Sequence, residues 1–360
     1  MPVERVLMTA DAVGGVWGYT LDLARALIAR GVAVDLAVMG PAPSPAQRAD
    51  AAAAGVPPVV LPYRLEWMDD PWRDVDEAGR ALLDLARTRR PDVVHLNGFC
   101  HAALPWPAPV VTVAHSCVRS WWRAVHGTDA PPSFDEYRRR VTRGLQAAAM
   151  VVAPSAAMLR ALDREYTVTR PSRVIANGRG FMRLPAVERE PIVLAAGRLW
   201  DEAKNIAALC AAAAEFSWPL FVAGDDRDPQ GRRAAPSGGP HLGTLPPERL
   251  AEWYARASIY ALPARYEPFG LSILEAAASG CALVLGDIDS LRENWDGAAL
   301  FVNHDDRPAI AAAIQSLIDD PARRRQLAYA ASARAAGFTV DRMAAGYLDV
   351  YGSLVPAGVA

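Results

Sequence analysis

Two glutamates, Glu267 and Glu275, stand with seven residues between them on either side of a Pro-Phe-Gly-Leu segment. We expect Glu267 on the loop after a strand and Glu275 in the first turn of the next helix. A carboxylate accepts hydrogen bonds, so one glutamate can bind sugar hydroxyls and the other glutamate a ribose diol. Gly270 lets the backbone approach a ligand, and amides at a helix start favour an anion. The alternative is a glutamate that complements the helix dipole and a second one on the surface.

Two cations, Arg198 and Lys204, follow a strand that ends in Gly197. A diphosphate leaving group needs its charge neutralised as the bond to it breaks. Arginine can bind phosphate with two parallel hydrogen bonds, and lysine acts as a point charge. Two solvated surface cations are the alternative, but the glutamate pair favours a phosphate site.

Gly14 and Gly15 follow the first strand, and His115 follows a later one. Adjacent glycines permit a tight turn that brings amides against a ligand at a helix start, although G-x-G-x-x-G is not met. A plain strand–helix turn is the alternative. His115 lies at the carboxyl end of its strand, where open α/β sheets bind ligands. A satisfied polar residue is the alternative there.

Weaker candidates are His95 and Asn97 at the end of the preceding strand, and the aromatic pair Trp121 and Trp122. His95 and Asn97 are candidates for the acceptor side, although a structural role is favoured for each. The tryptophans can stack on a sugar or an aromatic acceptor, and packing explains them equally well.

Short β-branched runs alternate with helical patterns, which indicates parallel sheets with crossover helices. The expected strands are 6–8, 32–38, 92–96, 110–114, 150–153, 192–196, 220–223, 259–262 and 282–285. The expected helices are 15–30, 205–216, 247–257, 271–279, 307–319, 321–336 and 340–351. The rhythm restarts after a Gly- and Pro-containing break near 177–190, so we predict two doubly wound α/β domains, 1–177 and 191–336, with the site in the cleft between them.

The composition is that of an ordinary globular protein, with 52% hydrophobic and 22% charged residues among 360. This excludes a disordered or collagen-like chain, and a net charge of −2 disfavours nucleic acid as a partner. Four separated cysteines without metal-binding spacing predict reduced thiols, and we expect no metal. We expect no secretory signal and no transmembrane segment, hence a cytoplasmic protein, and peripheral membrane contact stays open.

The run from Glu267 to Glu275 resembles the E-x7-E signature of retaining GT-B glycosyltransferases, especially glycosyltransferase family 4, and 276–284 is similar to the family's EA-A-GCPVV run. The segment 197–204 resembles the family's GR-x5-K element, and the Gly-Gly loop and His115 have counterparts in the family. The resemblance covers nearly the whole chain. It implies the GT-B architecture of two Rossmann-like domains, an acceptor domain followed by a donor domain, and a last helix within 337–360 that crosses back to the first domain.

The resemblance also implies a role for each matching residue. Glu267 would bind hydroxyls of the donor sugar, Glu275 the ribose, and Arg198 and Lys204 the phosphates. The loop backbone at Phe269, Gly270 and Leu271 would contact sugar and phosphate. Gly14 and Gly15 would face the donor phosphates and the acceptor, and His115 would lie near the reacting carbon.

The implied activity is metal-independent transfer of a hexosyl group with retention, without a cofactor. The donor would be a nucleotide-diphosphate sugar, UDP- or GDP-linked, and the acceptor a sugar, glycolipid or small molecule. The chain departs from the family pattern at Arg179 in Asn-Gly-Arg-Gly, where Asn-Gly-Val-Asp is usual, at Ala264, and over 286–293. Alternatives are a silent sugar-nucleotide or carbohydrate-binding protein, a nucleotide-sugar hydrolase or epimerase, and a nicotinamide dehydrogenase, which the missing glycine fingerprint disfavours.

Overall fold

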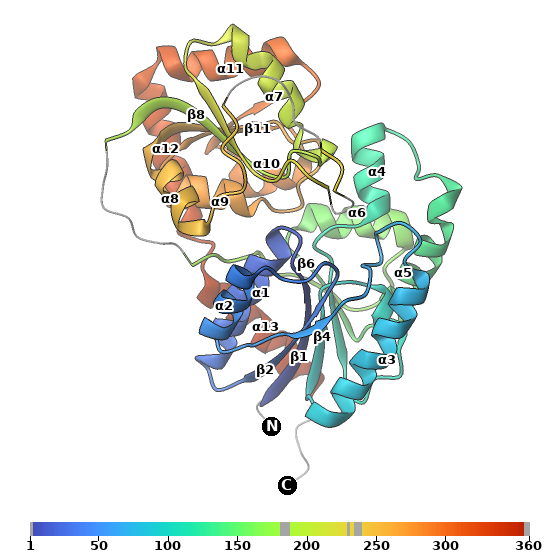
Figure 1. Cartoon of the computed structure of the whole chain (residues 1–360). Helices are drawn as coiled ribbons and strands as arrows, with labels where there is room; N and C mark the ends of the chain where they lie inside the picture. Colours follow the sequence, from blue (N-terminus) through green and yellow to red (C-terminus); the bar gives the residue numbers. More distant parts are fainter. Residues whose placement is uncertain (1–2, 181–187, 229–230, 234–239, 356–360) are drawn as a thin grey trace. The chain divides into compact units, whose positions relative to one another are not determined.

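The computed structural model describes residues 3–180, 188–228, 231–233 and 240–355. The chain divides into two compact units (Figure 1). The first comprises Met1–Arg123, Thr128–Gly178 and Thr339–Ala360, and the second Ala124–Gly127 and Arg179–Phe338. Each unit is built on a parallel sheet, which confirms the expected α/β class.

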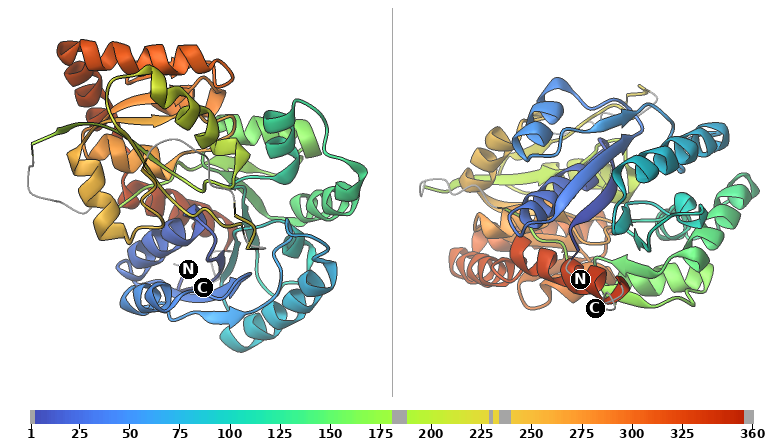
Figure 2. Two further views of the ribbon diagram at one scale, coloured as in Figure 1. Left: turned by 45° about the horizontal axis from the view of Figure 1, so that its top comes forward. Right: turned by 90° about the horizontal axis from the view of Figure 1, so that it is seen from below.

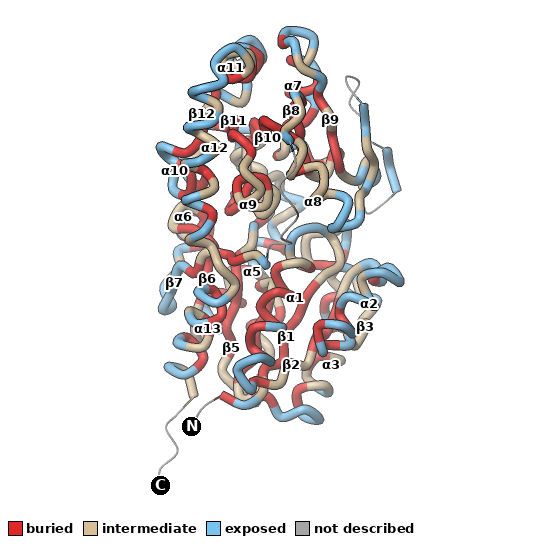
Figure 3. Tube along the Cα trace, turned by 90° about the vertical axis from the view of Figure 1, so that its left-hand side faces the viewer, coloured by how far each residue is buried: buried red, intermediate tan, exposed pale blue. Residues whose placement is uncertain are grey.

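The first unit contains a seven-stranded sheet in the order β3-β2-β1-β4-β5-β6-β7. Its strands are β1 Arg5–Asp11, β2 Ala33–Met39, β3 Val59–Leu61, β4 Val93–Leu96, β5 Val110–Val113, β6 Met150–Ala153 and β7 Ser172–Val174. Every residue of β4 and β5 is buried, whereas the edge strand β7 is exposed (Figure 3). The inner strands are apolar runs because helices cover both faces of the sheet.

Helices α1 and α13 cover one face of this sheet, and α3 and α5 cover the other (Figure 1). The helices of the unit are α1 Gly15–Ile28, α2 Pro45–Ala53, α3 Trp72–Arg89, α4 Val118–His126, α5 Asp135–Ala147, α6 Ala156–Tyr166 and α13 Val340–Leu354, although the end of α4 from Ala124 is grouped with the second unit. Helix α13, from the end of the chain, lies beside α1 (Figure 2). Its Tyr347 and Tyr351 are fully buried, and Thr339 caps its first turn.

The second unit contains a five-stranded sheet in the order β12-β11-β10-β8-β9. Its strands are β8 Glu190–Ala196, β9 Leu220–Ala223, β10 Ala257–Leu262, β11 Ala282–Gly286 and β12 Ala299–Val302. Its helices are α7 Ile206–Ala212, α8 Pro247–Arg256, α9 Leu271–Ala278, α10 Asp289–Trp295, α11 Arg307–Asp319 and α12 Pro321–Ala335. Because β8 and β10 pair in parallel, the loops that follow them leave the same edge of the sheet.

Several sequence expectations need correction. The helix expected over 205–216 is shorter, because α7 ends at Ala212 and the chain continues as a single 3-10 turn over Ala213–Glu215. No element was expected over 59–61, 172–174 or 299–302, where β3, β7 and β12 form. These strands have three or four residues and lie at sheet edges, so their sequence signal is short. Half of the linker expected near 177–190 falls on 181–187, outside the described residues.

Candidate functional site

The structure brings together Lys204 and Glu267, from the loops after β8 and β10. Nζ of Lys204 lies 2.6 Å from Oε2 of Glu267, and the two side chains are 15% and 13% exposed. The loops are joined by backbone and side-chain contacts. Arg265 donates its N–H to the carbonyl of Ala203 at 2.8 Å, and Asn205 donates Nδ2 to the carbonyl of Pro263 at 3.0 Å. A cation and a carboxylate, both predicted from sequence, therefore share one edge of the second sheet.

Arg198 lies on the same loop as Lys204. Its Nη2 donates to Oδ2 of Asp201 at 2.6 Å, and its guanidinium lies 5.0 Å from the centre of the Trp200 ring. Asp201 is buried, and it also caps the short turn Glu202–Lys204 by accepting from the N–H of Ala203. Nε of Arg198 is buried and has no hydrogen-bond partner among the described residues. Nε of Arg198 is thus an unsatisfied donor next to the position where a phosphate contact was predicted.

Gly270 forms the turn into α9. Its φ of 90° is one that residues with a side chain rarely adopt, and a Cβ there would lie 2.6 Å from Cδ1 of Ile273. The Tyr260 hydroxyl donates to the carbonyl of Ala196 at 3.0 Å and lies 2.8 Å from Oγ of Ser272, so the end of β8 is linked to the start of α9. The first N–H groups of a helix lack partners within it and can bind an anion.

The side chain of Phe269 is buried and packs edge-on against Phe338, with ring centres 5.4 Å apart. Its side chain is therefore not open to a ligand, and the predicted contact through the Phe269 backbone stays a prediction. Leu271, the first residue of α9, is partly exposed.

Glu275 lies in the second turn of α9 and not in the expected first turn, because the helix begins at Leu271. Its Oε1 accepts from Nε of Arg179 at 2.6 Å, and the two side chains are 20% and 23% exposed. In the sequence, Arg179 stands out only as a departure from the family pattern. The unusual Asn-Gly-Arg-Gly was the signal that could have marked it as a partner for a site carboxylate.

Lys204 is the only lysine in the sequence, and every other cation counted in Lys+Arg is an arginine. Lysine presents a compact ammonium where arginine presents a planar guanidinium, and the one exception falls on a residue predicted to bind phosphate. This signal was present in the sequence and was missed.

In the first unit, His115 and His95 both contact Asn97. Nε2 of His115 lies 2.9 Å from Oδ1 of Asn97, and Nε2 of His95 lies 3.1 Å from the same oxygen. Burial lowers the pKa of His115 to about 3 and that of His95 to about 4. Both imidazoles are therefore neutral at pH 7, and neither is a general acid there.

Gly14 and Gly15 are both exposed at the start of α1, and Gly14 has a φ of 90°. Their position fits a backbone that approaches a ligand. His101, also near the end of β4, is buried and contacts the carbonyl of Val75 through Nε2 at 2.9 Å, as a structural histidine does.

Helix α4 carries Trp121 and Trp122, which pack against each other with ring centres 6.1 Å apart. Trp122 also lies 5.7 Å from the ring of Phe134, so packing accounts for part of the surface of this pair. Their acceptor role stays a prediction.

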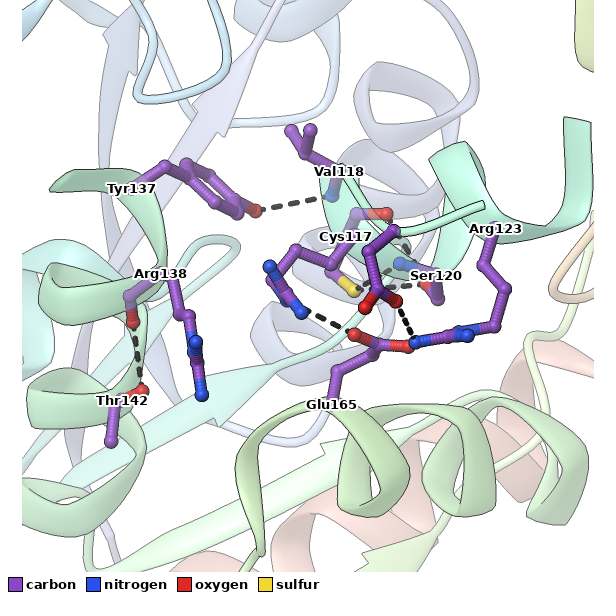
Figure 4. Close-up of polar contacts among 10 residues, drawn as sticks. Cys117, Val118, Ser120, Arg123, Tyr137, Arg138, Thr142 and Glu165 are labelled. Carbon is purple, nitrogen blue, oxygen red and sulfur yellow. Dashed lines mark hydrogen bonds and ion pairs between the residues drawn. The ribbon is translucent and has the colours of Figure 1, made fainter. Parts of the chain in front are cut away.

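Arg123, on the same helix, donates Nε to Oε1 of Glu165 at 2.7 Å, and Figure 4 shows the two side chains pointing toward each other. Arg119 binds the other oxygen of Glu165 at 3.0 Å. One buried carboxylate of α6 therefore holds two arginines of α4, spaced one helical turn apart.

Two family models match the chain: Glycosyltransferase Family 4 over residues 13–179, and Glycosyl transferases group 1 over residues 190–320. D-inositol 3-phosphate glycosyltransferase 1 of Catenulispora acidiphila is 36% identical over 119 residues, which is 31% of this chain and 28% of that protein. Glycogen synthase of Mycobacterium tuberculosis is 40% identical over 95 residues, 26% of this chain and 23% of that protein. The chain thus spans about a quarter of the length of these relatives.

Solved structures resemble the whole chain. Sucrose-phosphate synthase from Thermosynechococcus elongatus is similar with a TM-score of 0.79 at 22% identity, over 98% of this chain and 99% of that one. Anabaena HepE, solved in complex with UDP and glucose, is similar with a TM-score of 0.74 at 16% identity, over 98% of this chain and 100% of that one. This likeness shows the fold, a GT-B architecture with two Rossmann-like units. Among the described helices, none is long and apolar enough to cross a membrane.

Proposed function

Because the chain belongs to glycosyltransferase family 4, we propose that it transfers a sugar from a nucleotide-diphosphate donor to a hydroxyl-bearing acceptor, with retention of configuration. The observation that carries the proposal is the grouping of Arg198, Lys204 and Glu267 at one edge of the second sheet. The two cations stabilise the departing diphosphate, and Glu267 accepts hydrogen bonds from the donor sugar.

The proposed donor is a UDP- or GDP-linked sugar bound to the second unit, with its ribose on Glu275. The proposed acceptor is a sugar, glycolipid or small molecule. In a same-face displacement the leaving phosphate itself can take the acceptor proton, so no side chain has to act as a general base. This agrees with His115, whose low pKa makes it a weak base.

Transfer from a radiolabelled nucleotide sugar, with EDTA present throughout, tests the proposal. The donor is first selected from a panel of nucleotide diphosphates and their sugars by thermal shift, since binding to the folded state raises apparent stability. We expect a labelled glycoside that forms only with acceptor and retains the anomeric configuration of the donor. Free sugar as the sole product would indicate a hydrolase, and binding without turnover a silent binding protein. Dependence on added Mg²⁺ or Mn²⁺ would contradict charge neutralisation by Arg198 and Lys204.

A further inference from the structure

The amide of Asn97 has a fixed orientation. Its Nδ2 lies 2.7 Å from the carbonyl oxygen of Thr9 and 3.2 Å from Oγ1 of Thr20. A carbonyl oxygen only accepts hydrogen bonds, so the atom that faces Thr9 must be the nitrogen. The backbone N–H of Asn97 donates to Oγ1 of Thr9 at 2.9 Å, which holds the same residue a second time. Oδ1 of Asn97 must therefore be the atom that faces the histidines.

This orientation determines where the histidine protons lie. Oδ1 of Asn97 only accepts, so Nε2 of His115 and Nε2 of His95, at 2.9 and 3.1 Å, must each carry a proton. Burial keeps both rings neutral, so each has one N–H. Nδ1 of His95 is then an acceptor, in agreement with the Tyr351 hydroxyl at 2.6 Å, which donates to it.

Nδ1 of His115 is an acceptor by the same reasoning. The ring is held in place by Tyr19, whose ring meets it edge-on with centres 4.5 Å apart. Among the described residues, none donates a hydrogen bond to Nδ1 of His115, and the residue is not fully covered.

We propose that Asn97 is a positioning residue that holds His115 as the Nε2–H tautomer, so that its Nδ1 accepts a hydrogen bond from a substrate hydroxyl. The tautomer follows from the structure, and the substrate contact rests on the function proposed above. A group presented in this way selects a ligand hydroxyl and does not bind an anionic oxygen, because an unprotonated nitrogen repels an acceptor.

Two-bond ¹H–¹⁵N spectra of [¹⁵N]histidine-labelled protein at pH 7 test the tautomer directly. The signals of His115 are assigned with His115→Gln. We expect the wild-type ring to be protonated on Nε2 and bare on Nδ1. Signals of the Nδ1–H form, or an average of both forms, would overturn the proposal. Asn97→Leu should shift His115 toward a mixture, and Thr20→Val is a milder change to the same amide if the first variant does not fold. If the tautomer of His115 is unchanged in folded Asn97→Leu, Asn97 does not determine it.

A pair of variants tests the acceptor role. His115→Asn keeps an amide near the position of Nδ1, whereas His115→Gln keeps one near Nε2. We expect kcat/KM of His115→Asn to exceed that of His115→Gln by about tenfold, the value of one hydrogen bond. Equal losses, or a more active His115→Gln, would overturn the role of Nδ1. The spectra need no turnover, so an inactive protein with the expected tautomer counts against the proposed function alone.

Discussion

The ammonium of Lys204 and the carboxylate of Glu267 lie 2.6 Å apart, although the two residues are 63 positions apart in the sequence. Each neutralises the other, so a diphosphate that binds Lys204 must compete with Glu267. The two side chains therefore have separable effects. Lys204 should determine diphosphate affinity, and Glu267 should determine the rate of sugar transfer.

Replacing Lys204 removes charge from the leaving-group site. We expect Lys204→Gln to cut transfer by about 10²-fold or more, the scale of losing one charge-stabilising donor. Lys204→Arg should also lose at least about tenfold, because a planar guanidinium does not replace a compact ammonium. Initial rates with labelled donor measure both. Arg227→Gln, an exposed cation of the same unit, is the control and should keep its rate. Full activity of Lys204→Gln would exclude Lys204 from the site.

Replacing Glu267 should separate binding from transfer. Glu267→Gln leaves Lys204 without its carboxylate partner, so we expect the nucleoside diphosphate to bind as tightly as to wild type or more tightly. Transfer should nevertheless fall by about 10²-fold, because the contact to the sugar is weakened. Calorimetric titration and initial rates give the two values. Parallel loss of diphosphate affinity and transfer would contradict a role toward the sugar.

Glu275 should determine the preference for ribose. The amide of Glu275→Gln is a poorer acceptor for a diol than a carboxylate. We therefore expect this variant to lose most of the preference for a ribonucleoside diphosphate over its 2′,3′-dideoxy analogue. Arg179→Met should reduce the same preference partly, since Arg179 orients the carboxylate through Oε1. The ratio of the two dissociation constants is the measurement. An unchanged ratio in Glu275→Gln would show that Glu275 does not bind the ribose.

Gly270→Ala places a methyl group 2.6 Å from Ile273 and 3.3 Å from Cγ of Glu267. We expect a loss of stability of about 1–2 kcal/mol from the positive φ, together with a loss of transfer of at least about tenfold. Gly297→Ala is the matched control, because Gly297 has a φ of 75° and no atom within 4 Å of the new methyl. It should lose similar stability and keep its activity. Equal activity losses in both variants would indicate a general effect of backbone strain.

Acid should destabilise the first unit through its histidines with lowered pKa values. His95 and His115 have native pKa values of about 4 and about 3, below the ordinary 6.5. Between pH 6.5 and about 4 the unfolded chain binds protons that the native chain does not. Each histidine therefore lowers the free energy of unfolding by about 1.4 kcal/mol per pH unit as the pH falls.

Urea unfolding at pH 7 and pH 5 measures this slope. His95→Gln should reduce it, with the exposed His126→Gln as control. A slope that is the same in wild type and His95→Gln would contradict the neutral, buried state of His95.

The long inner strands and the glutamate–cation grouping could be predicted from sequence, because apolar runs identify buried parallel strands. The loops that carry the site residues then follow the carboxyl ends of these strands. The edge strands β3, β7 and β12 are too short for that signal. The partners of the site residues could not be predicted either. The contact of Arg179 with Glu275 depends on where α9 begins, and the shared contact of His95 and His115 with Asn97 depends on the pairing of β4 with β5.

The most direct test of the account uses the single lysine of the chain. Protein labelled with [¹⁵N]lysine gives one side-chain ammonium signal, which belongs to Lys204. The signal is followed while UDP, GDP or ADP is added in EDTA, with the matching nucleoside as the phosphate-free control. We predict a saturable shift with the diphosphate that stabilises the protein most, and none with the nucleoside. An unmoved Lys204 signal, while calorimetry shows that diphosphate bound, would contradict the claim that this ammonium holds the leaving group.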